Sequence, residues 1–387
     1  MNQQHRGEVG KADHRRAARL SDAGLQVPAA PAWMRWLPVA YVAAVLLLEP
    51  VTPVQWPVSF LLIALPVIAA YTQGPVGVAA VTVFAIAFEA VLAGTPCCAG
   101  RNAHDLWERH YVGAYISTAL VGFIGTVLSA HRKRQEAHLL HANSVAEALM
   151  HTLLRPVPHQ VGHVLAASLY HPAEAGTMVG GDLFDICATP AGERAIIGDV
   201  RGKGLQAVRT VADVLGSFRQ AAYDPGDLLQ VAVSMERRIT REAAAILDDE
   251  LFVTAALVEY DSRANRVTII NHGHIEPVLI SGGEVNTLAG PPALPLGLGV
   301  LAPGRPVSYE HRFAPGDVLL LCTDGLMEAR DHGGVFYPLL DQLRTRFAGL
   351  AAPTPRDVID FLDTDLPRHA RALHDDVAIL AIAPHGR

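Results

Sequence analysis

Four long apolar runs between residues 33 and 130 constrain the fold of this chain more than any other feature. The runs are Trp33–Glu49, Val54–Tyr71, Pro75–Ala93 and Tyr111–Ala130. Each carries very little charge and approaches the roughly 20 residues that an α-helix needs to cross about 30 Å of hydrocarbon. In a soluble bundle, such helices would have no polar face to turn toward water. We therefore expect a membrane domain over residues 33–130, with four transmembrane helices in contact with lipid.

Basic residues flank this apolar region on both sides. They are Arg6, Lys11, Arg15, Arg16, Arg19 and Arg35 before it, and Arg132, Lys133 and Arg134 after it. Because basic flanks stay in the cytoplasm, both sides should be cytoplasmic and the number of crossings even. Residues 1–32 are expected to form a disordered basic cytoplasmic tail. The sequence thus predicts a multi-pass protein of the cell membrane, with its N-terminus and its C-terminal part in the cytoplasm.

Glu89 is an acidic residue inside the third run, away from the run's boundaries. An acid within a membrane span is a candidate for a sensing or proton-linked role. Glu89 lies only about one turn from the end of its run, however. We therefore expect its side chain to reach the membrane interface.

The composition excludes one large class of function. A chain of 387 residues has room for two or three domains, and its formal net charge is −7. A general nucleic-acid-binding protein would be expected to show a basic face. We therefore expect no nucleic-acid partner.

A helical linker is predicted between the membrane domain and the rest of the chain, over residues 131–155. Its apolar residues follow a heptad spacing: Leu139, Ala142, Ala146, Leu149 and Leu153. Such a seam could pair two copies of the chain as a homodimer through residues 139–153. A solvated amphipathic linker explains the pattern nearly as well. Pro156 and Pro158 should end the helix.

From residue 156 to residue 387 the pattern changes to short strands and helices. Strands are expected at Val164–Tyr170, Arg194–Val200, Phe252–Tyr260, Arg266–Asn271, Pro277–Ser281, Asp317–Cys322 and Val377–Ala383. Helices are expected at about 204–222, 226–247, 336–348 and 355–370. Consecutive strands joined by short turns favour antiparallel pairing. A layered α+β domain is therefore predicted.

Four short acidic segments stand beside glycines or apolar runs in this domain. They are Gly-Gly-Asp-Leu-Phe-Asp at 180–185, Gly-Asp-Val-Arg-Gly-Lys-Gly at 198–204, Thr-Asp-Gly at 323–325 and Asp-Asp at 375–376. Folding can bring such carboxylates together into the oxygen-rich site that Mg²⁺ or Mn²⁺ prefers. A single Asp-Gly is more often only a turn. The set of four predicts a divalent-metal site.

The order of these and other motifs is specific. Tyr-His-Pro-Ala at 170–173, Phe-Val-Thr-Ala-Ala-Leu at 252–257, Asn-His-Gly-His at 271–274, Pro-Leu-Gly-Leu at 295–298 and His-Asp-Asp-Val-Ala at 374–378 accompany the acidic segments. Over roughly residues 145–384 the chain resembles the PP2C-type metal-dependent serine/threonine phosphatases, in their bacterial SpoIIE/RsbU-like branch. The resemblance implies an α/β/β/α sandwich of two antiparallel sheets flanked by helices.

The resemblance also implies a role for each acidic residue. Two Mn²⁺ or Mg²⁺ ions are expected, with Asp199 bridging them and the backbone carbonyl of Val200 as a further ligand. Water activated by the two ions would attack the phosphoryl group. The remaining acids fall into two groups, with Asp182, Asp324 and Asp375 as metal ligands and Asp185 and Asp376 as supports of the ligands.

Three positions depart from the family pattern. One is Cys322, which replaces a tyrosine common before Thr-Asp-Gly. Arg201 stands where many eukaryotic relatives carry a histidine that serves as general acid, and it is a candidate phosphate contact. His272 replaces the alanine usual in the branch. Two histidines, His272 and His274, could suggest zinc, but without further ligands the signal is weak. A structural hydrogen bond from His274 is the preferred interpretation.

The sequence therefore predicts a membrane-anchored phosphatase that hydrolyses phosphoserine or phosphothreonine. By resemblance, its substrate would be a phosphorylated anti-anti-sigma protein with a STAS domain, in a partner-switching pathway that controls transcription. The alternative is a membrane sensor whose phosphatase-like domain acts by protein binding without catalysis. The scarcity of polar residues in the four runs disfavours transport.

Overall fold

The computed structural model describes residues 32–48, 58–94, 109–173, 178–246, 248, 250–301, 304–350, 352–370 and 372–385. The chain divides into two compact units, Met1–His141 and Ala142–Arg387, and each is considered by itself. The predicted disordered tail, up to residue 31, lies outside the described residues.

The first unit is helical. Its elements are η1 (Ala32–Trp36), α2 (Leu37–Leu48), η3 (Val58–Ala64), α3 (Leu65–Thr72), α4 (Pro75–Gly94) and the first part of α5 (Arg109–Leu153). Among the described residues, only α4 and α5 are long and apolar enough to cross a membrane. The apolar helices Leu37–Leu48 and Phe60–Thr72 are shorter than a span requires. The expectation of four transmembrane helices is therefore not confirmed.

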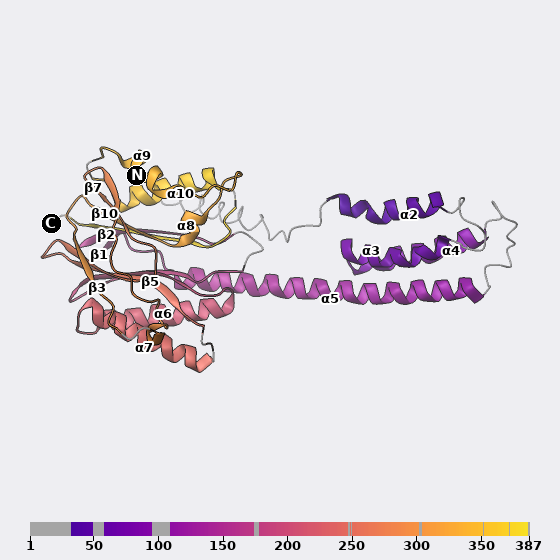
Figure 1. Cartoon of the computed structure of the whole chain (residues 1–387), viewed down its shortest axis with the longest axis horizontal. Helices are drawn as coiled ribbons and strands as arrows, with labels where there is room; N and C mark the ends of the chain where they lie inside the picture. The colour runs from indigo at the N-terminus through magenta and orange to yellow at the C-terminus, as the bar shows by residue number, and fades with distance from the viewer. Residues whose placement is uncertain are drawn as a thin grey trace, which may run out of the picture. The chain divides into compact units, whose positions relative to one another are not determined.

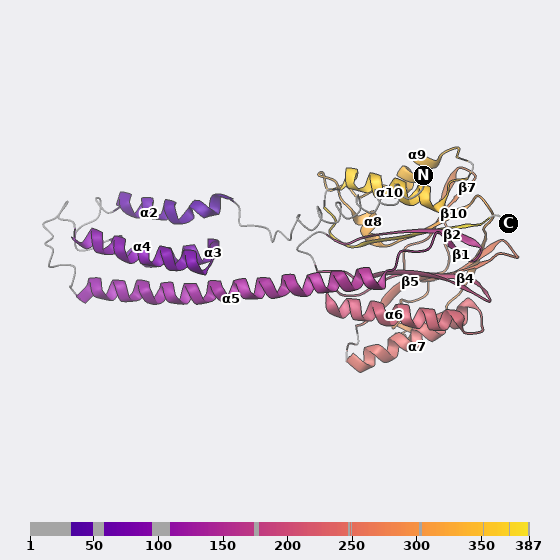
Figure 2. The same cartoon turned by 180° about the vertical axis from the view of Figure 1, so that it is seen from behind.

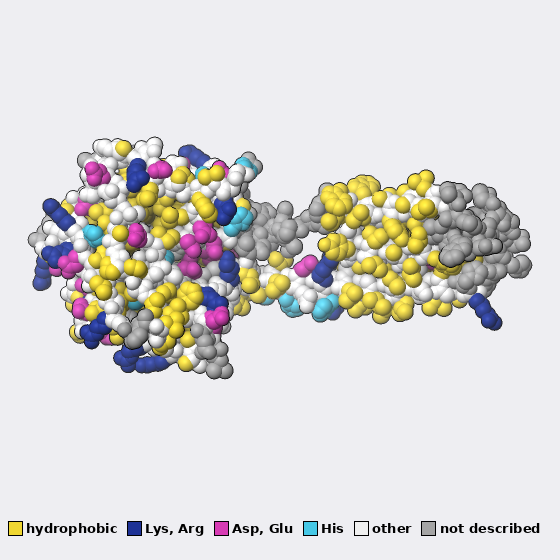
Figure 3. Space-filling view, in the orientation of Figure 1, with side chains coloured by type: hydrophobic (Ala, Val, Ile, Leu, Met, Phe, Trp, Pro, Cys, Tyr) yellow, Lys and Arg dark blue, Asp and Glu magenta, His cyan; other side chains and the backbone are white. Residues whose placement is uncertain are grey.

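The outer surface of this first unit is apolar. Val76, Val83 and Leu47 are among its exposed side chains, and Figure 3 shows hydrophobic side chains covering helices α2 to α5. Its buried core is small and contains Val45 and Leu65. The unit therefore exposes more large apolar side chains than it buries, which is unusual for a surface in water.

Glu89 is buried within the first unit, and its expected place at a membrane interface stays a prediction. Its side chain is only 2% exposed, and the hydroxyl of Thr118 donates a hydrogen bond to Glu89 Oε1 at 2.9 Å. Glu89 lies on α4 and Thr118 on α5, so the carboxylate is held between two helices. Pairing across helices is the usual arrangement for an acid in an apolar helical unit.

The predicted linker is not a separate element, because α5 runs without a break from Arg109 to Leu153. Ala146 and Met150 on its last turns are fully buried in the core of the second unit, whereas Leu139 and Leu149 are exposed. The unit boundary therefore falls at residues 141/142 rather than 155/156. Ala146, one residue of the predicted heptad seam, packs in the core of the second unit. Dimerisation through residues 139–153 stays a prediction.

The second unit contains two antiparallel sheets. One has the strand order β1-β2-β11-β10-β7-β8 and the other β3-β4-β5-β6-β9. The strands are β1 (Gln160–Val161), β2 (Val164–His171), β3 (Asp182–Thr189), β4 (Gly192–Val200), β5 (Val253–Asp261), β6 (Arg266–His272), β7 (Val278–Ser281), β8 (Glu284–Thr287), β9 (Tyr309–Arg312), β10 (Val318–Cys322) and β11 (Val377–Pro384). Short turns join β3 to β4 and β5 to β6, as antiparallel pairing allows.

Helices cover the outer face of each sheet, as Figures 1 and 2 show from opposite sides. Helices α6 (Leu205–Tyr223) and α7 (Leu228–Ile246) pack on the five-stranded sheet. Helices α9 (Leu339–Phe347) and α10 (Pro355–His369) pack on the six-stranded sheet, and the short α8 (Asp324–Glu328) contacts β11. The expected α/β/β/α sandwich of two antiparallel sheets is confirmed.

The amphipathic pattern of these helices explains their packing. In α6, Val211, Leu215 and Phe218 follow one another at spacings of four and three and are all buried. A helix with this spacing has one apolar stripe, which must be covered by another layer. Buried apolar side chains also fill the space between the two sheets, so the sheets are held face to face.

Candidate metal centre

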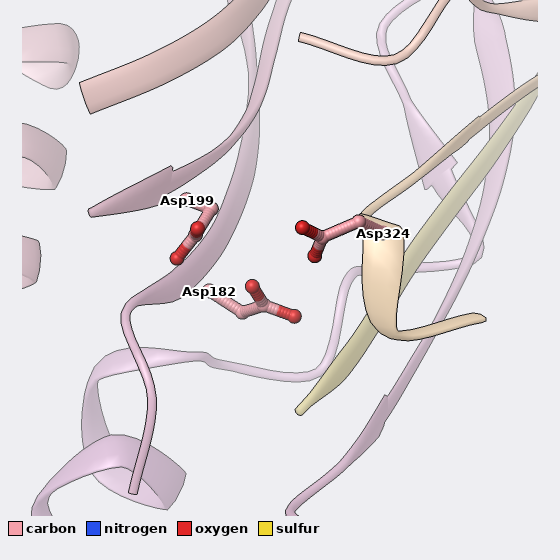
Figure 4. Close-up of side chains that lie close together, drawn as sticks. All are labelled: Asp182, Asp199 and Asp324. Carbon is pink, nitrogen blue, oxygen red and sulfur yellow. The ribbon is translucent and has the colours of Figure 1, made fainter. Parts of the chain in front are cut away.

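Three aspartates from different strands and a helix meet where the two sheets face each other. Asp182 is the first residue of β3 and pairs in register with Asp199 near the end of β4. Asp324 begins α8, directly after β10 of the other sheet. Figure 4 shows the three carboxylates turned toward one another. The fold therefore joins acids that lie up to 142 residues apart, the separation of Asp182 and Asp324.

The three carboxylates are close enough to share an ion. One oxygen of each lies within 4.8 Å of an oxygen of the other two. Asp182 is only 3% exposed, Asp199 is half-buried and Asp324 is exposed at the rim. The site is thus closed on the Asp182 side and open on the Asp324 side.

The close approach of like charges is costly, and the pKa values reflect it. Burial, and then the charge of Asp199, raise the pKa of Asp182 well above its ordinary range. Burial, and then the charge of Asp324, raise the pKa of Asp199 to about 7. Burial and Asp375 likewise raise the pKa of Asp324. Each shift has the sign expected of buried carboxylates that lie close to one another.

A divalent cation fits this donor set. No lysine or arginine forms an ion pair with Asp182, Asp199 or Asp324 among the residues that the structure describes. The carboxylate oxygens are hard ligands, which suit Mg²⁺ or Mn²⁺ better than zinc. The carbonyl oxygen of Val200 lies beside Gly181, next to Asp182 in the chain, and so near the cluster.

Thr323 links the two sheets at the site. Its hydroxyl donates a hydrogen bond to Asp182 Oδ2 at 2.6 Å and accepts one from the backbone N–H of Ala378 at 2.9 Å. The side chain is fully buried. The sequence analysis assigned no role to Thr323. Its position directly before Asp324, at the end of a buried strand, is the sequence feature that could have indicated a role at the site.

Gly181 and Gly325 allow the close approach of backbone that the site needs. A Cβ atom on Gly181 would lie 2.2 Å from the carbonyl oxygen of Val200, and one on Gly325 would lie 1.9 Å from the carbonyl oxygen of Asp376. Neither distance is possible without moving the backbone. The glycines beside the aspartates are therefore required by packing.

Replacing Gly181 with alanine is expected to lower the affinity for Mn²⁺ by at least about tenfold, because the new Cβ must push Asp182 and Asp199 apart. Calorimetric titration of the full chain measures this affinity. Gly216→Ala in α6 is the matched control, since a Cβ atom there meets no atom within 4 Å. It should leave the affinity unchanged and, if anything, stabilise the helix. Equal affinities for the two variants would contradict the argument.

Asp375 and Asp376 are adjacent but have different surroundings. Asp376 is 1% exposed and accepts hydrogen bonds from Tyr170 Oη at 2.7 Å, the Ala173 N–H at 2.8 Å and the Gly180 N–H at 3.0 Å. Asp375 is half-exposed and pairs with Lys203 Nζ at 3.1 Å. Asp376 therefore fixes the backbone before β3 at Ala173 and Gly180, whereas Asp375 faces the open side of the aspartate cluster.

Two predicted site residues are not brought to the cluster. Asp185 lies three residues after Asp182 on β3 and so on the opposite face, where it pairs with Arg219 of α6 at 2.5 Å. Arg201 is bound to the side chain of Glu250 and donates to its carbonyl oxygen at 2.9 Å. A phosphate contact by Arg201 would require it to exchange this partner.

Hydrogen bonds tie His274 to neighbouring residues of the five-stranded sheet. His274 Nδ1 lies 3.2 Å from the hydroxyl of Thr254, and the side chain of Asn271 bonds the backbone of His274 in both directions. The interpretation of His274 as a structural residue agrees with these contacts. Within the described residues, the aspartate cluster is the only group of metal-ligating side chains at such distances.

Comparison with known proteins gives concordant findings. The family model described as stage II sporulation protein E (SpoIIE) matches residues 190–385. Phosphoserine phosphatase RsbU of Bacillus subtilis is 22% identical over 205 residues, which cover 52% of this chain and 58% of that protein. The chain thus spans little more than half the length of this curated relative.

Solved structures also resemble the chain. The PP2C domain of SiaA from Pseudomonas aeruginosa is 20% identical, with a TM-score of 0.49 over 66% of this chain and 98% of that one. The structure of the RsbU and RsbW domains of a Mycobacterium tuberculosis protein is 25% identical, with a TM-score of 0.47 over 59% and 61% of the two chains.

Proposed function

The chain belongs to the SpoIIE family, and from this premise we propose that it is a metal-dependent phosphatase that hydrolyses phosphoserine or phosphothreonine in a protein. The observation that carries the proposal is the convergence of Asp182, Asp199 and Asp324, each from a different secondary-structure element. The name of the relative RsbU, phosphoserine phosphatase, supports the same chemistry.

Each residue of the site has a task in this proposal. Asp182, Asp199, Asp324 and Asp375, together with the carbonyl oxygen of Val200, would hold two Mn²⁺ or Mg²⁺ ions. Such ions would supply an acidified water and neutralise the oxygens of a phosphoryl group. In the structure Asp375 pairs with Lys203, so it would have to exchange this partner to serve as a ligand.

Other residues act on the ligands or on the substrate. Thr323 orients Asp182 through its short hydrogen bond. Lys203, once released from Asp375, is placed to contact the phosphoryl group, because it stands on the open side of the site.

The substrate that we propose is a phosphorylated STAS-domain anti-anti-sigma protein in a partner-switching pathway. The test incubates the full chain, in lipid nanodiscs with Mn²⁺, with such a protein phosphorylated on serine, and measures released phosphate. We expect release to stop when a chelator is added and to return with Mn²⁺. A chain that binds the phosphoprotein tightly but releases no phosphate under any metal condition would favour the alternative function, a sensor that acts by binding alone.

We further propose that the first unit anchors the phosphatase in the cell membrane, with the second unit in the cytoplasm. The lengths of α4 and α5 and the exposed apolar side chains of the first unit support this. Expressed in bacteria, the full chain should sediment with membranes and resist alkaline carbonate, but dissolve in detergent. Recovery of the chain in the carbonate supernatant would contradict a transmembrane anchor.

A further inference from the structure

A pocket lies on the outer side of the five-stranded sheet. It has a volume of about 920 Å³ and lies between α7 and the segment that follows β8. Val233 of α7 and Leu294, Val300 and Val307 of that segment form much of its wall, and all four are exposed. In Figure 3, hydrophobic side chains gather over the part of the unit where Figure 1 draws α6 and α7. This size and lining are typical of small-molecule sites.

His272 is one of the residues that line this pocket. Its side chain is only 4% exposed, and its Nδ1 lies 2.8 Å from the carbonyl oxygen of Leu294. A carbonyl oxygen can only accept, so Nδ1 carries the proton and donates. Burial lowers the pKa of His272, which keeps the ring neutral. Its Nε2 is therefore a hydrogen-bond acceptor, and it is buried with no partner among the described residues.

An unpaired buried acceptor has an energetic cost, which a ligand could remove by donating a hydrogen bond. His272 is also the position where the chain departs from the alanine usual in the branch. An alanine there would offer no acceptor.

The pocket is separate from the aspartate cluster. His272 on β6 pairs with Ala255 on β5, and Ala255 pairs with Gly198 on β4. Residues that pair across neighbouring strands point to the same face of a sheet, and the next residue along each strand points to the opposite face. Asp199 follows Gly198, so its side chain points toward the other sheet while that of His272 points toward α7.

The charged groups around the pocket favour an anion. Arg237, Arg241 and Arg305 line it and are exposed. None of the three has an ion pair or hydrogen bond within the described part of the chain. The single acid in the lining is Glu236, whose carboxylate oxygens accept hydrogen bonds from the Gly297 and Gly299 N–H groups at 2.7 and 2.9 Å. The free positive charge therefore exceeds the negative charge.

We propose that this pocket binds a small amphipathic anion that carries a hydroxyl or N–H group. The apolar body of the ligand lies against Leu294 and Val300, its donor group reaches His272 Nε2, and its anionic end faces the arginines. The inference goes beyond the proposed phosphatase function and does not depend on it, because binding at the pocket needs no metal.

Three naphthalene probes test the proposal without any variant. The first, 6-hydroxy-2-naphthoate, has all three features; 6-methoxy-2-naphthoate lacks the donor, and 6-(hydroxymethyl)-2-naphthol lacks the anion. Equilibrium dialysis with probe fluorescence measures binding to the full chain in lipid nanodiscs, with empty nanodiscs as the blank. We expect saturable binding of the first probe, and binding about tenfold weaker for each of the other two. Absence of saturable binding by the first probe would overturn the proposal.

Two variants then locate the site. In His272→Phe the hydroxy and methoxy probes should bind equally, because the acceptor that distinguishes them is gone. The pair Arg237→Gln and Arg241→Gln should weaken the naphthoate about tenfold, whereas the control pair Arg344→Gln and Arg356→Gln, with the same change of charge on α9 and α10, should not. An unchanged preference for the hydroxy probe in His272→Phe, or equal effects of the two arginine pairs, would place the binding elsewhere and refute the assignment.

Discussion

Replacing Asp199 with asparagine is expected to reduce phosphate release from a phosphoserine protein by on the order of a thousandfold. Asparagine keeps the shape of the side chain but removes one of the three negative charges of the cluster. Ligated ions contribute several kcal/mol to the stabilisation of charge in a phosphoryl transition state, and each 1.36 kcal/mol is about tenfold in rate. Because a carboxylate oxygen of Asp199 lies within 4.8 Å of one from Asp182 and one from Asp324, its loss should affect the whole site.

The measurement is the rate of phosphate release at saturating Mn²⁺ and saturating substrate, so that weakened binding is not mistaken for lost catalysis. Asp360→Asn is the matched control, because Asp360 is an exposed residue of α10 that pairs with Arg356. It should retain the full rate. A rate for Asp199→Asn within tenfold of the control would show that the aspartate cluster is not where the chemistry occurs.

Replacing Asp376 with alanine should have the largest effect on stability. Three donors would lose their acceptor: the buried N–H of Gly180, and the part-buried Tyr170 hydroxyl and Ala173 N–H. Unpaired buried donors cost about 1–3 kcal/mol each, so a loss of about 3 kcal/mol or more in the free energy of unfolding is expected. In a domain of this size that corresponds to a fall in Tm of roughly 6–12 °C.

Asp375→Ala is the natural comparison, because it alters the neighbouring residue with the same chemistry. Its pair with Lys203 is half-exposed, and surface pairs of this kind stabilise little. We expect Tm to change by less than about 2 °C, and the affinity for Mn²⁺ to fall by about tenfold or more. Thermal melting followed by circular dichroism measures the first quantity, and calorimetric titration measures the second. Equal falls in Tm for the two variants would contradict the division of roles.

Much of the fold could be predicted from local patterns, and the failures have physical reasons. The strands expected at Phe252–Tyr260 and Val377–Ala383 are rich in apolar residues, and both lie within one residue of the observed ends. No strand is expected at β3, because Gly181, Asp182 and Asp185 are turn-forming residues by composition. It is a strand because its Leu183, Phe184 and Ile186 are buried between layers. The short strands β8 and β9 are polar, so they show no alternation of apolar residues from which a strand could be predicted.

The acids of the site could be predicted, but not all of the residues that support them. Asp182, Asp199 and Asp324 were expected to meet, and they do. The resemblance could not decide between members of the pair Asp182 and Asp185, since that depends on which face of β3 each occupies. The role of Thr323 depends on a contact across two sheets, which no local pattern encodes.

The first unit shows the same limit. Composition alone indicated apolar helices, and the structure has them. The length of each helix and the partner of Glu89 depend on where neighbouring segments pack. Glu89 is expected at an interface because of its place in the sequence, and in the structure Thr118 on α5 donates a hydrogen bond to it.

Titration of the metal-free chain with Mn²⁺ tests the central claim most directly. The account predicts that the full chain, stripped of metal by a chelator and then dialysed, binds two Mn²⁺ ions. It also predicts that Asp199→Asn loses at least one of them while Asp360→Asn keeps both. A chain that binds no Mn²⁺, or binds it equally in all three forms, would contradict the assignment of a divalent-metal phosphatase site to Asp182, Asp199 and Asp324.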